Sequence, residues 1–273
     1  MSMIELTPRR GSDPGPATRI DDQGHPALRR VADVLRSRAA TPRTLLLDDA
    51  DSIDQAALSG VRVESIYSTP KHAEEATGLR DRMSGADQFI VAEDTMRSLL
   101  PRDNASRVLA LARAPRPARW ADLAAASGDV LVLDGVRITG NVGAIIRSAS
   151  ALGASGVVLV DSGLGTAFDR RLVRASRGLV FALPTLLADR DDVVSFLSTT
   201  RMPLLGLAAD AQAPLEHISR RYGRAAILLG SERFGPSEQL EAAVAARYSI
   251  PMEPGVESLN VSVAAALALY ERR

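Results

Sequence analysis

The apolar run Val130–Asp134 leads into a glycine-punctuated turn and then a helix-forming segment, an arrangement that often binds phosphate. Gly135 and Gly140 have the spacing of a phosphate-binding loop, but Asn141 and Val142 stand where Lys and Ser or Thr are required. The lysine that contacts the phosphates in such loops is therefore missing. The dinucleotide pattern G-x-G-x-x-G is also absent from the sequence. Both observations argue against an NTPase and against an NAD(P)-dependent enzyme.

Two polar residues of this segment remain as candidates for chemistry, Asn141 and Arg147. Asn141 stands near the expected start of the helix, and capping of the free backbone N–H groups is the simplest interpretation of an isolated Asn there. Arg147 is the lone charged residue on a helix of Ala, Ile, Leu and Ser. The simplest interpretation is an exposed side chain whose charged group lies in water. We favour a position facing a site, because a charged group on so apolar a helix needs a partner.

Two later segments carry further polar groups. The apolar run Ile227–Gly230 passes into Ser231 and Glu232, at the carboxyl end of an expected strand, where open α/β sheets bind ligands. The segment Ile250–Val263 places Ser258 and Asn260 just before an apolar helix. Taken singly, each of these residues could cap a helix or form a turn.

Composition restricts the class of protein further. The chain has 273 residues, 33 basic and 33 acidic, no cysteine, and no apolar run long enough to span a membrane. The amino terminus lacks the hydrophobic core of a signal peptide, so we expect a cytoplasmic protein without membrane contact. The three histidines lie far apart in the sequence, so we expect no metal site. All basic residues except Lys71 are arginine, which reflects either a GC-rich genome or binding to phosphate groups.

The elements that position these residues fall into two α/β domains. Residues 1–24 are polar and rich in Pro, Gly and Asp, and we expect them to be disordered. Apolar periodicity predicts a small α/β domain over residues 25–112, and two prolines within three residues predict a linker over 113–126. Residues 127–273 contain continuous apolar runs typical of a parallel sheet covered on both faces. These runs are Val130–Asp134, Val157–Asp161, Leu204–Ala208 and Ile227–Gly230.

Three ordered motifs in the second domain resemble those of the SpoU (TrmH) RNA 2′-O-ribose methyltransferases. They are Asn141-x-Gly143-x-x-x-Arg147, Leu229-Gly-Ser-Glu232, and Ile250-Pro-Met with Glu257–Val263. The resemblance covers about residues 127–272 and implies an α/β domain of the SPOUT class with a trefoil knot. The segments 112–119, 169–178 and 230–237 resemble the thiostrepton- and nosiheptide-resistance branch, which methylates a 23S rRNA adenosine. The amino-terminal domain is loosely similar to the L30e-like RNA-binding domain of that branch.

The resemblance implies S-adenosylmethionine as cofactor, ribosomal RNA as substrate and a homodimer as the assembly. The family holds its cofactor largely by loop backbone, at positions that match Leu207, Ala208, Gly230, Ser231, Ile250, Met252, Ser258 and Leu259. Its catalytic arginine falls on Arg147, and its supporting polar residues fall on Asn141, Glu232, Ser258 and Asn260. We expect Gly143 and Gly230 to let the backbone pass close to a ligand.

The role of Arg147 has two interpretations. Arginine stays protonated in proteins, so Arg147 is a poor general base unless the RNA phosphate helps to remove its proton. Alternatively, Arg147 holds the phosphate and the ribose hydroxyl while the phosphate or Glu232 accepts the proton. We favour the holding role, since positioning supplies much of the acceleration when the methyl donor is already activated.

Arginines elsewhere are candidates for phosphate contacts. The cluster Arg29, Arg30, Arg36, Arg38 and Arg43 could be a solvated helix face, but beside an RNA methyltransferase domain we expect RNA binding, above all by the last three. We expect the same of Arg107, Arg116, Arg174 and Arg177. Two alternatives remain open: a housekeeping tRNA or rRNA methyltransferase with another target, and a catalytically silent RNA-binding protein. The intact motif residues argue against the silent protein.

Overall fold

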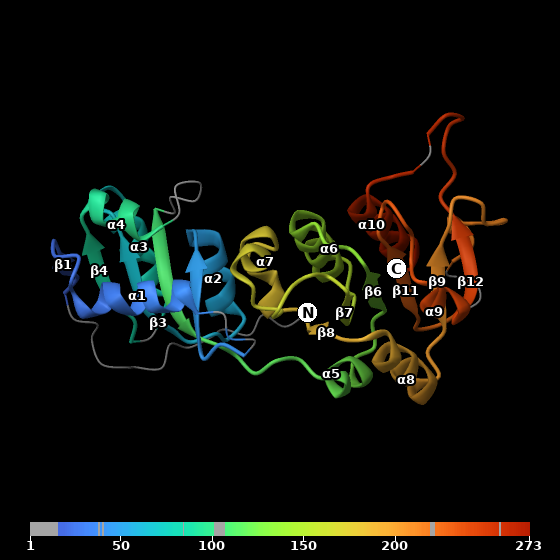
Figure 1. The fold of residues 1–273 in the computed structure, drawn as a ribbon, viewed down its shortest axis with the longest axis horizontal. Coiled ribbons are helices and arrows are strands. Elements are labelled where there is room, and N and C mark those ends of the chain that lie inside the picture. Colours follow the sequence, from blue (N-terminus) through green and yellow to red (C-terminus); the bar gives the residue numbers. More distant parts are fainter. Residues whose placement is uncertain are drawn as a thin grey trace. The chain divides into compact units, whose positions relative to one another are not determined.

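The computed structural model describes residues 16–37, 39, 41–83, 85–100, 107–218, 222–256 and 258–273. The chain divides into two compact units, Met1–Ala114 and Pro115–Arg273, and each is an α/β unit with its own sheet (Figure 1). Within the described residues, no helix is both long and apolar enough to cross a membrane.

The first unit is built on a five-stranded mixed sheet in the order β1-β4-β3-β5-β2. Strands β1, β4 and β3 pair in parallel, and β5 pairs antiparallel with both β3 and β2. The strands are β1 (Thr18–Ile20), β2 (Thr44–Asp48), β3 (Val63–Ser68), β4 (Asp87–Val91) and β5 (Val108–Arg113). This α/β arrangement over residues 25–112 agrees with the alternation of elements expected from the sequence.

Helices cover both faces of this sheet. Helix α1 (Pro26–Arg36) buries Leu28 and Val31 in a core cluster that also contains Leu109 and Leu111 of β5, and α4 (Glu93–Leu99) adds Met96 to it. Helices α2 (Ala50–Leu58) and α3 (Ala73–Asp81) contact each other and the strands β2 to β5. A short 3-10 helix, Pro70–His72, precedes α3.

The expected disorder of residues 1–24 is wrong for the part of that segment that the structure describes. Thr18–Ile20 form β1 and pair in parallel with Phe89–Val91 of β4, and Ile20 is 1% exposed. A three-residue strand is too short to give a periodic signal, and its stability comes from the edge pairing and from the burial of one isoleucine. Residues 1–15 lie outside the described residues.

The second unit contains a seven-stranded sheet in the order β10-β12-β9-β11-β6-β7-β8, and every neighbouring pair is parallel. The apolar runs singled out in the sequence form its central strands, which confirms the parallel sheet. The strands are β6 (Val130–Asp134), β7 (Gly156–Val160), β8 (Thr185–Leu187), β9 (Leu204–Leu207), β10 (Ala213–Pro214), β11 (Ala226–Gly230) and β12 (Val244–Ser249).

Helices again form a layer on each face. Side chains of α5 (Trp120–Ala125), α8 (Arg190–Thr200) and α9 (Glu238–Ala242) share one core cluster with alternate residues of β6, β7 and β11. Helix α6 (Thr139–Ala151) contacts both α7 (Arg170–Ala175) and α10 (Val261–Glu271), and α10 contacts β11 (Figure 1). Two short 3-10 helices, Leu179–Phe181 and Leu215–His217, complete the unit.

The linker expected over residues 113–126 is wrong in two places. Arg113 still belongs to β5, and residues 120–125 form α5 of the second unit. The reason is burial: Leu123 is fully buried and the Trp120 ring stacks on Phe196 with centroids 4.8 Å apart. The prolines predicted a break in regular structure, but the apolar residues behind them attach the segment to the second core.

The topology brings distant segments together at one edge of this sheet. Strands β6 and β11 are hydrogen-bonded neighbours, with Asp134 in register with Gly230. From β6, the chain leaves through α6 towards β7, whereas β11 lies on the opposite side of β6. Open α/β sheets bind ligands in the crevice outside the carboxyl ends of strands at such a point.

Candidate active site

Three side chains predicted as catalytic meet at this edge. Asn141 donates from Nδ2 to Oε1 of Glu232 at 3.0 Å, and Asn260 donates from Nδ2 to the same oxygen at 3.1 Å. Asn260 Nδ2 also donates to Oδ1 of Asn141 at 3.2 Å, and the backbone N–H of Val261 lies 3.4 Å from Glu232 Oε1. One carboxylate oxygen therefore gathers three donors from two helices, and Oε2 remains for another partner.

The structure corrects the capping role considered for Asn141. Helix α6 begins at Thr139 after Ile138, so Asn141 lies inside the first turn and its amide points away from its own backbone to Glu232. Asn260 is the capping residue: its Oδ1 accepts from the backbone N–H of Ser262 at 2.9 Å at the start of α10. Residue type alone did not distinguish the two asparagines, because the position of a cap depends on the first helical residue.

A buried acid that sequence reasoning missed anchors the opposite side of the site. Asp134 is 1% exposed and accepts from Arg190 Nη2 at 2.8 Å and from the backbone N–H of Ser237 at 2.7 Å. Burial by itself raises the pKa of Asp134, but hydrogen bonds from Ser237 and Arg190 outweigh it, and the net pKa is lowered. The carboxylate thus ties the segment after β11 to the end of β6. Its place at a strand's carboxyl end was the available signal.

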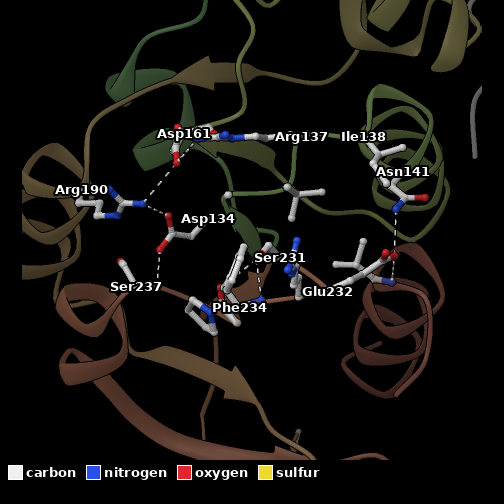
Figure 2. A pocket seen from close by; sticks show the side chains of 16 residues that line it. Asp134, Arg137, Ile138, Asn141, Asp161, Arg190, Ser231, Glu232, Phe234 and Ser237 are labelled. Atoms are coloured by element: carbon white, nitrogen blue, oxygen red, sulfur yellow. Dashed lines mark hydrogen bonds and ion pairs between the residues drawn. The ribbon is translucent and has the colours of Figure 1, made fainter. Parts of the chain in front are cut away.

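Between these two groups lies a pocket of about 430 Å³ (Figure 2). The hydrogen bond between Asn141 and Glu232 lies at one side and the Asp134 interactions lie at the other. Arg137, at the top of the view in Figure 2, donates from Nη2 to both carboxylate oxygens of Asp161, at 2.7 and 2.8 Å. The pocket is lined by residues 134–138, 141, 161, 190, 231–237 and 261.

Most residues expected to hold a cofactor lie beside this pocket rather than in it. Leu207 ends β9 and Ala208 follows it, Gly230 ends β11 and Ser231 follows it, and the segment with Ile250 and Met252 follows β12. These strands are parallel neighbours, so their carboxyl ends meet at one edge. Of the expected cofactor residues, Ser231 alone also lines the pocket.

The chemistry of these loops fits an adenosyl sulfonium ligand. They offer half-buried aliphatic side chains, such as Leu207, Ile250 and Leu259, together with backbone amides. Ser258 is exposed beside them. A hydrogen bond from Ala208 N to Tyr248 O at 3.0 Å holds the first loop against β12. An apolar wall with backbone donors suits a purine ring and a thioether-like chain.

The structure gives a packing reason for two glycines that were expected to lie close to a ligand. A Cβ on Gly143 would lie 2.4 Å from the Cβ of Ala175, so this glycine allows α6 and α7 to pack. A Cβ on Gly230 would lie 2.1 Å from the backbone nitrogen of Pro236, so this glycine allows the turn after β11 to fold back on the strand. Both close approaches are between segments of the chain itself rather than towards a ligand space.

Arg147 does not join the cluster. It lies on α6 six residues after Asn141, its side chain is exposed, and no residue in the described part of the chain forms a hydrogen bond or an ion pair with it. Six residues correspond to about 240° around a helix at roughly 3.6 residues per turn, so the two side chains leave different faces. The partner expected for Arg147 is absent from the described residues of this chain.

The arginines expected to bind RNA are exposed wherever the structure describes them, and some have local partners. Arg36 pairs with Asp33 at 2.9 Å, and Arg116 forms two bonds of 2.6 Å to Asp122. Hydrogen bonding from Arg116 holds the pKa of Asp122 at about 2. Arg38 lies outside the described residues, and the remaining exposed members are Arg43, Arg107, Arg174 and Arg177.

Two protein-family models match most of the chain. Residues 129–270 match the model of the SpoU rRNA methylase family, and the chain belongs to that family. Residues 17–126 match a second model, described as the amino terminus of thiostrepton-resistance methylases.

Individual relatives cover nearly the whole chain. A 23S rRNA (adenosine(1067)-2′-O)-methyltransferase of Streptomyces laurentii is 40% identical, covering 93% of this chain and 94% of the relative. An enzyme of the same name from Streptomyces azureus is 38% identical over the same shares. A crystal structure of an RNA 2′-O ribose methyltransferase is 30% identical, with a TM-score of 0.76 and coverage of 93% of this chain and 98% of the other.

Proposed function

We propose that this protein methylates the ribose 2′-hydroxyl of adenosine 1067 in 23S rRNA and thereby confers resistance to thiostrepton-type antibiotics. The observation that carries the proposal is the 40% identity along 93% of the chain to an enzyme named for this reaction. A different rRNA target is less well supported, because the 23S rRNA guanosine-2553 methyltransferase of Bacillus subtilis is 28% identical over 71% of the chain. The assembled Asn141, Glu232 and Asn260 cluster argues against a silent protein.

The cofactor of this reaction is S-adenosylmethionine, which supplies an activated methyl group when bound. We assign its binding to the loops after β9, β11 and β12, which contain Leu207, Ala208, Gly230, Ser231, Ile250, Met252, Ser258 and Leu259. Aliphatic side chains would enclose the adenosyl group, and loop amides would orient it.

Glu232 is the residue that we place at the ribose hydroxyl. Three donors hold its Oε1, which fixes the carboxylate plane and leaves Oε2 to accept the hydroxyl hydrogen bond. Asn141 and Asn260 act by positioning this carboxylate. Arg147 is exposed and without a partner among the described residues, as expected of a group that binds an RNA phosphate only in the complex.

The proposal also includes two finer features of the fold: a trefoil knot in the second unit and an L30e-like RNA-binding role for the first. The chain passes from β11 across β9 to form β12, and α10 then returns to contact α6 and β11. This crossing supports a trefoil knot in the second unit. The mixed sheet covered by helices on both faces supports an L30e-like RNA-binding role for the first unit, with its exposed arginines on the substrate.

A homodimer is supported by an apolar stripe on α10. Val263, Leu267 and Tyr270 are 46%, 38% and 65% exposed and lie four and three residues apart, on one helical face. The stripe would be covered by the same surface of a second copy, as in a two-fold interface. A ribosomal RNA substrate supports a cytoplasmic location for the proposed enzyme.

Methyl transfer from labelled S-adenosylmethionine tests the function. The substrates are an unmodified 23S rRNA fragment that contains adenosine 1067, the same fragment with 2′-deoxyadenosine at that position, and bulk tRNA. We expect incorporation into the first alone. Label in tRNA, or equal label in the deoxy fragment, would contradict the assignment, and unchanged thiostrepton sensitivity of cells that express the protein would contradict the resistance.

A further inference from the structure

The pocket between the carboxyl ends of β6, β7 and β11 shares only Ser231 with the residues assigned to the cofactor. It touches Asn141 and Glu232 at one side, but the loops after β9 and β12 contribute none of its described lining. Its volume of about 430 Å³ is within the usual range for small-molecule sites, roughly 300–1,000 Å³. A ligand group that reaches it would therefore adjoin the proposed reaction site without displacing the cofactor.

Two exposed apolar side chains line this pocket. Phe234 is 80% exposed and Ile138 is 59% exposed, and both belong to its lining. Ile138 precedes α6 near Asn141, and Phe234 follows Glu232 by two residues (Figure 2). The guanidinium carbon of Arg233 lies 5.1 Å from the centroid of the Phe234 ring. An aromatic ring with an adjacent guanidinium is typical of surfaces on which unpaired bases stack.

Local hydrogen bonds hold Phe234 in place. Ser231 and Gly235 exchange backbone hydrogen bonds of 3.2 and 2.9 Å, and the Phe234 N–H donates to Ser231 Oγ at 3.2 Å. The bond from Ser237 N to Asp134 fastens the far end of the turn at 2.7 Å. The exposed ring therefore stands on a tight, anchored turn, which lowers the entropy that is lost when a base stacks on it.

The polar groups of the pocket are mostly paired with each other. Arg190 bonds Asp134, and Arg137 uses Nε and Nη2 on Asp161, which leaves Nη1 for a ligand. Arg233 also lines the pocket, with its guanidinium over the Phe234 ring. An apolar wall beside a ring-stacked guanidinium and a free donor of Arg137 suits an aromatic ring that carries hydrogen-bond acceptors.

We propose that this pocket receives the base of the nucleotide that is methylated, with Phe234 and Ile138 against the ring and the ribose directed to Glu232. The inference rests on the proposed function, since it names the group that the same site recognises. It accounts for a pocket that adjoins the reaction site, shares only Ser231 with the residues assigned to the cofactor, and has two exposed apolar side chains in its lining.

The test is a double-mutant cycle between Phe234 and the base, carried out on the full-length protein. The variants are Phe234→Ala, Phe234→Trp, and Leu187→Ala as the control, which removes a different exposed apolar side chain of the same unit. The substrates are the 23S rRNA fragment with adenosine at the target and the same fragment with an abasic ribose there. We measure kcat/KM on both substrates, S-adenosylmethionine affinity by calorimetry, and fluorescence of a fragment with 2-aminopurine at the target.

We expect Phe234→Ala to lower kcat/KM about 5- to 150-fold on the adenosine fragment, the range found when a stacking aromatic is removed. On the abasic fragment the same variant should change kcat/KM less than two-fold, because the base that stacks is gone. Phe234→Trp should retain activity, Leu187→Ala should match the wild type, and the 2-aminopurine signal should rise on binding to wild type but less with Phe234→Ala.

Three results would overturn the proposal. One is an equal loss on the adenosine and abasic fragments, which would assign Phe234 to the fold or to another nucleotide. Another is unchanged kcat/KM for Phe234→Ala on the adenosine fragment. The third is a loss of S-adenosylmethionine affinity, which would assign the pocket to the cofactor. If the wild type methylates none of these fragments, the proposed function itself fails, and that result is distinct from all three.

Discussion

Replacement of Asp134 by alanine should destabilise the second unit by about 2–3 kcal/mol. The change removes two hydrogen bonds to a buried carboxylate, each worth roughly 1.5–3 kcal/mol when a partner is charged. We expect a loss at or somewhat below the smallest sum, about 3 kcal/mol, because the Arg190 side chain is 35% exposed and regains water, with Asp161 already 3.9 Å away. Asp134→Asn keeps an acceptor for Ser237 but turns an amide donor towards Arg190, so it should cost about half as much.

The single tryptophan makes the second unit separately observable. Trp120 is the sole tryptophan of the sequence and stacks on Phe196 in the second core, so its fluorescence during urea unfolding reports that unit. We expect a lower midpoint with an unchanged slope. In thermal unfolding, the same loss of stability should lower the midpoint temperature by about 4–12 °C. Glu241→Ala, which removes a more exposed ion pair with Arg247, is the control and should cost about 1 kcal/mol or less.

The stability of these variants relative to wild type should depend on pH in a defined direction. The pKa of Asp134 is lowered in the folded state, because the hydrogen bonds from Ser237 and Arg190 outweigh the effect of burial. Its contribution is therefore fully present above the unfolded pKa of aspartate, about 3.9, and is lost as pH falls through the lower folded value. The stability difference between wild type and Asp134→Asn should be flat near neutral pH and shrink in acid. A difference below about 0.5 kcal/mol at pH 7, or one that grows in acid, would refute this reasoning.

Three further outcomes are expected. Arg147→Ala should lower methyl transfer at least about 100-fold while S-adenosylmethionine affinity, measured by calorimetry, stays within two-fold; near-normal turnover would remove Arg147 from the reaction. Gly230→Ala should displace the turn at Pro236 and reduce activity, whereas Gly165→Ala, with no atom within 4 Å of its added Cβ, should not; equal activities would contradict the packing argument. Paired alanine substitutions of Arg36 and Arg43 should weaken RNA binding and flatten its salt slope by nearly one unit per lost contact, and an unchanged slope would assign them to a solvated surface.

The sequence predicted the parts of this molecule that depend on local patterns. Continuous apolar runs identified the central strands of the parallel sheet, since burial on both faces leaves no polar alternation. The two edge strands β1 and β10 were not predicted, because they are too short to show a pattern. β1 and β10 have three and two residues, too few for a period, and each is stabilised by its pairing with a longer strand.

The site shows the same division between local pattern and long-range contact. The polar motif residues Asn141, Glu232 and Asn260 were predicted together, although the bonds that join them span 28 to 119 residues of sequence. Their grouping came from the resemblance, because spacing along the chain carries no information about which strand ends are neighbours. Asp134 and Phe234 lie in segments that were named from the sequence, but neither residue was given a role there. Asp134 resembles any acid that ends a strand until Arg190, 56 residues later, is seen to bond it.

Phe234 shows why exposure becomes informative only in context. A single exposed aromatic is ordinary on a protein surface, and ten aromatic residues in the whole chain predicted little base stacking. In the structure, Phe234 lies on a turn held by hydrogen bonds, two residues from Glu232, and lines the same pocket as that carboxylate. Its exposure is significant because of this position. One ring at the reacting nucleotide can determine which base is accepted even where stacking contributes little to overall RNA affinity. Specificity and affinity should therefore separate experimentally: substitutions at Phe234 should act on kcat/KM for the target base, and substitutions of the arginines in the first unit should act on salt-dependent binding.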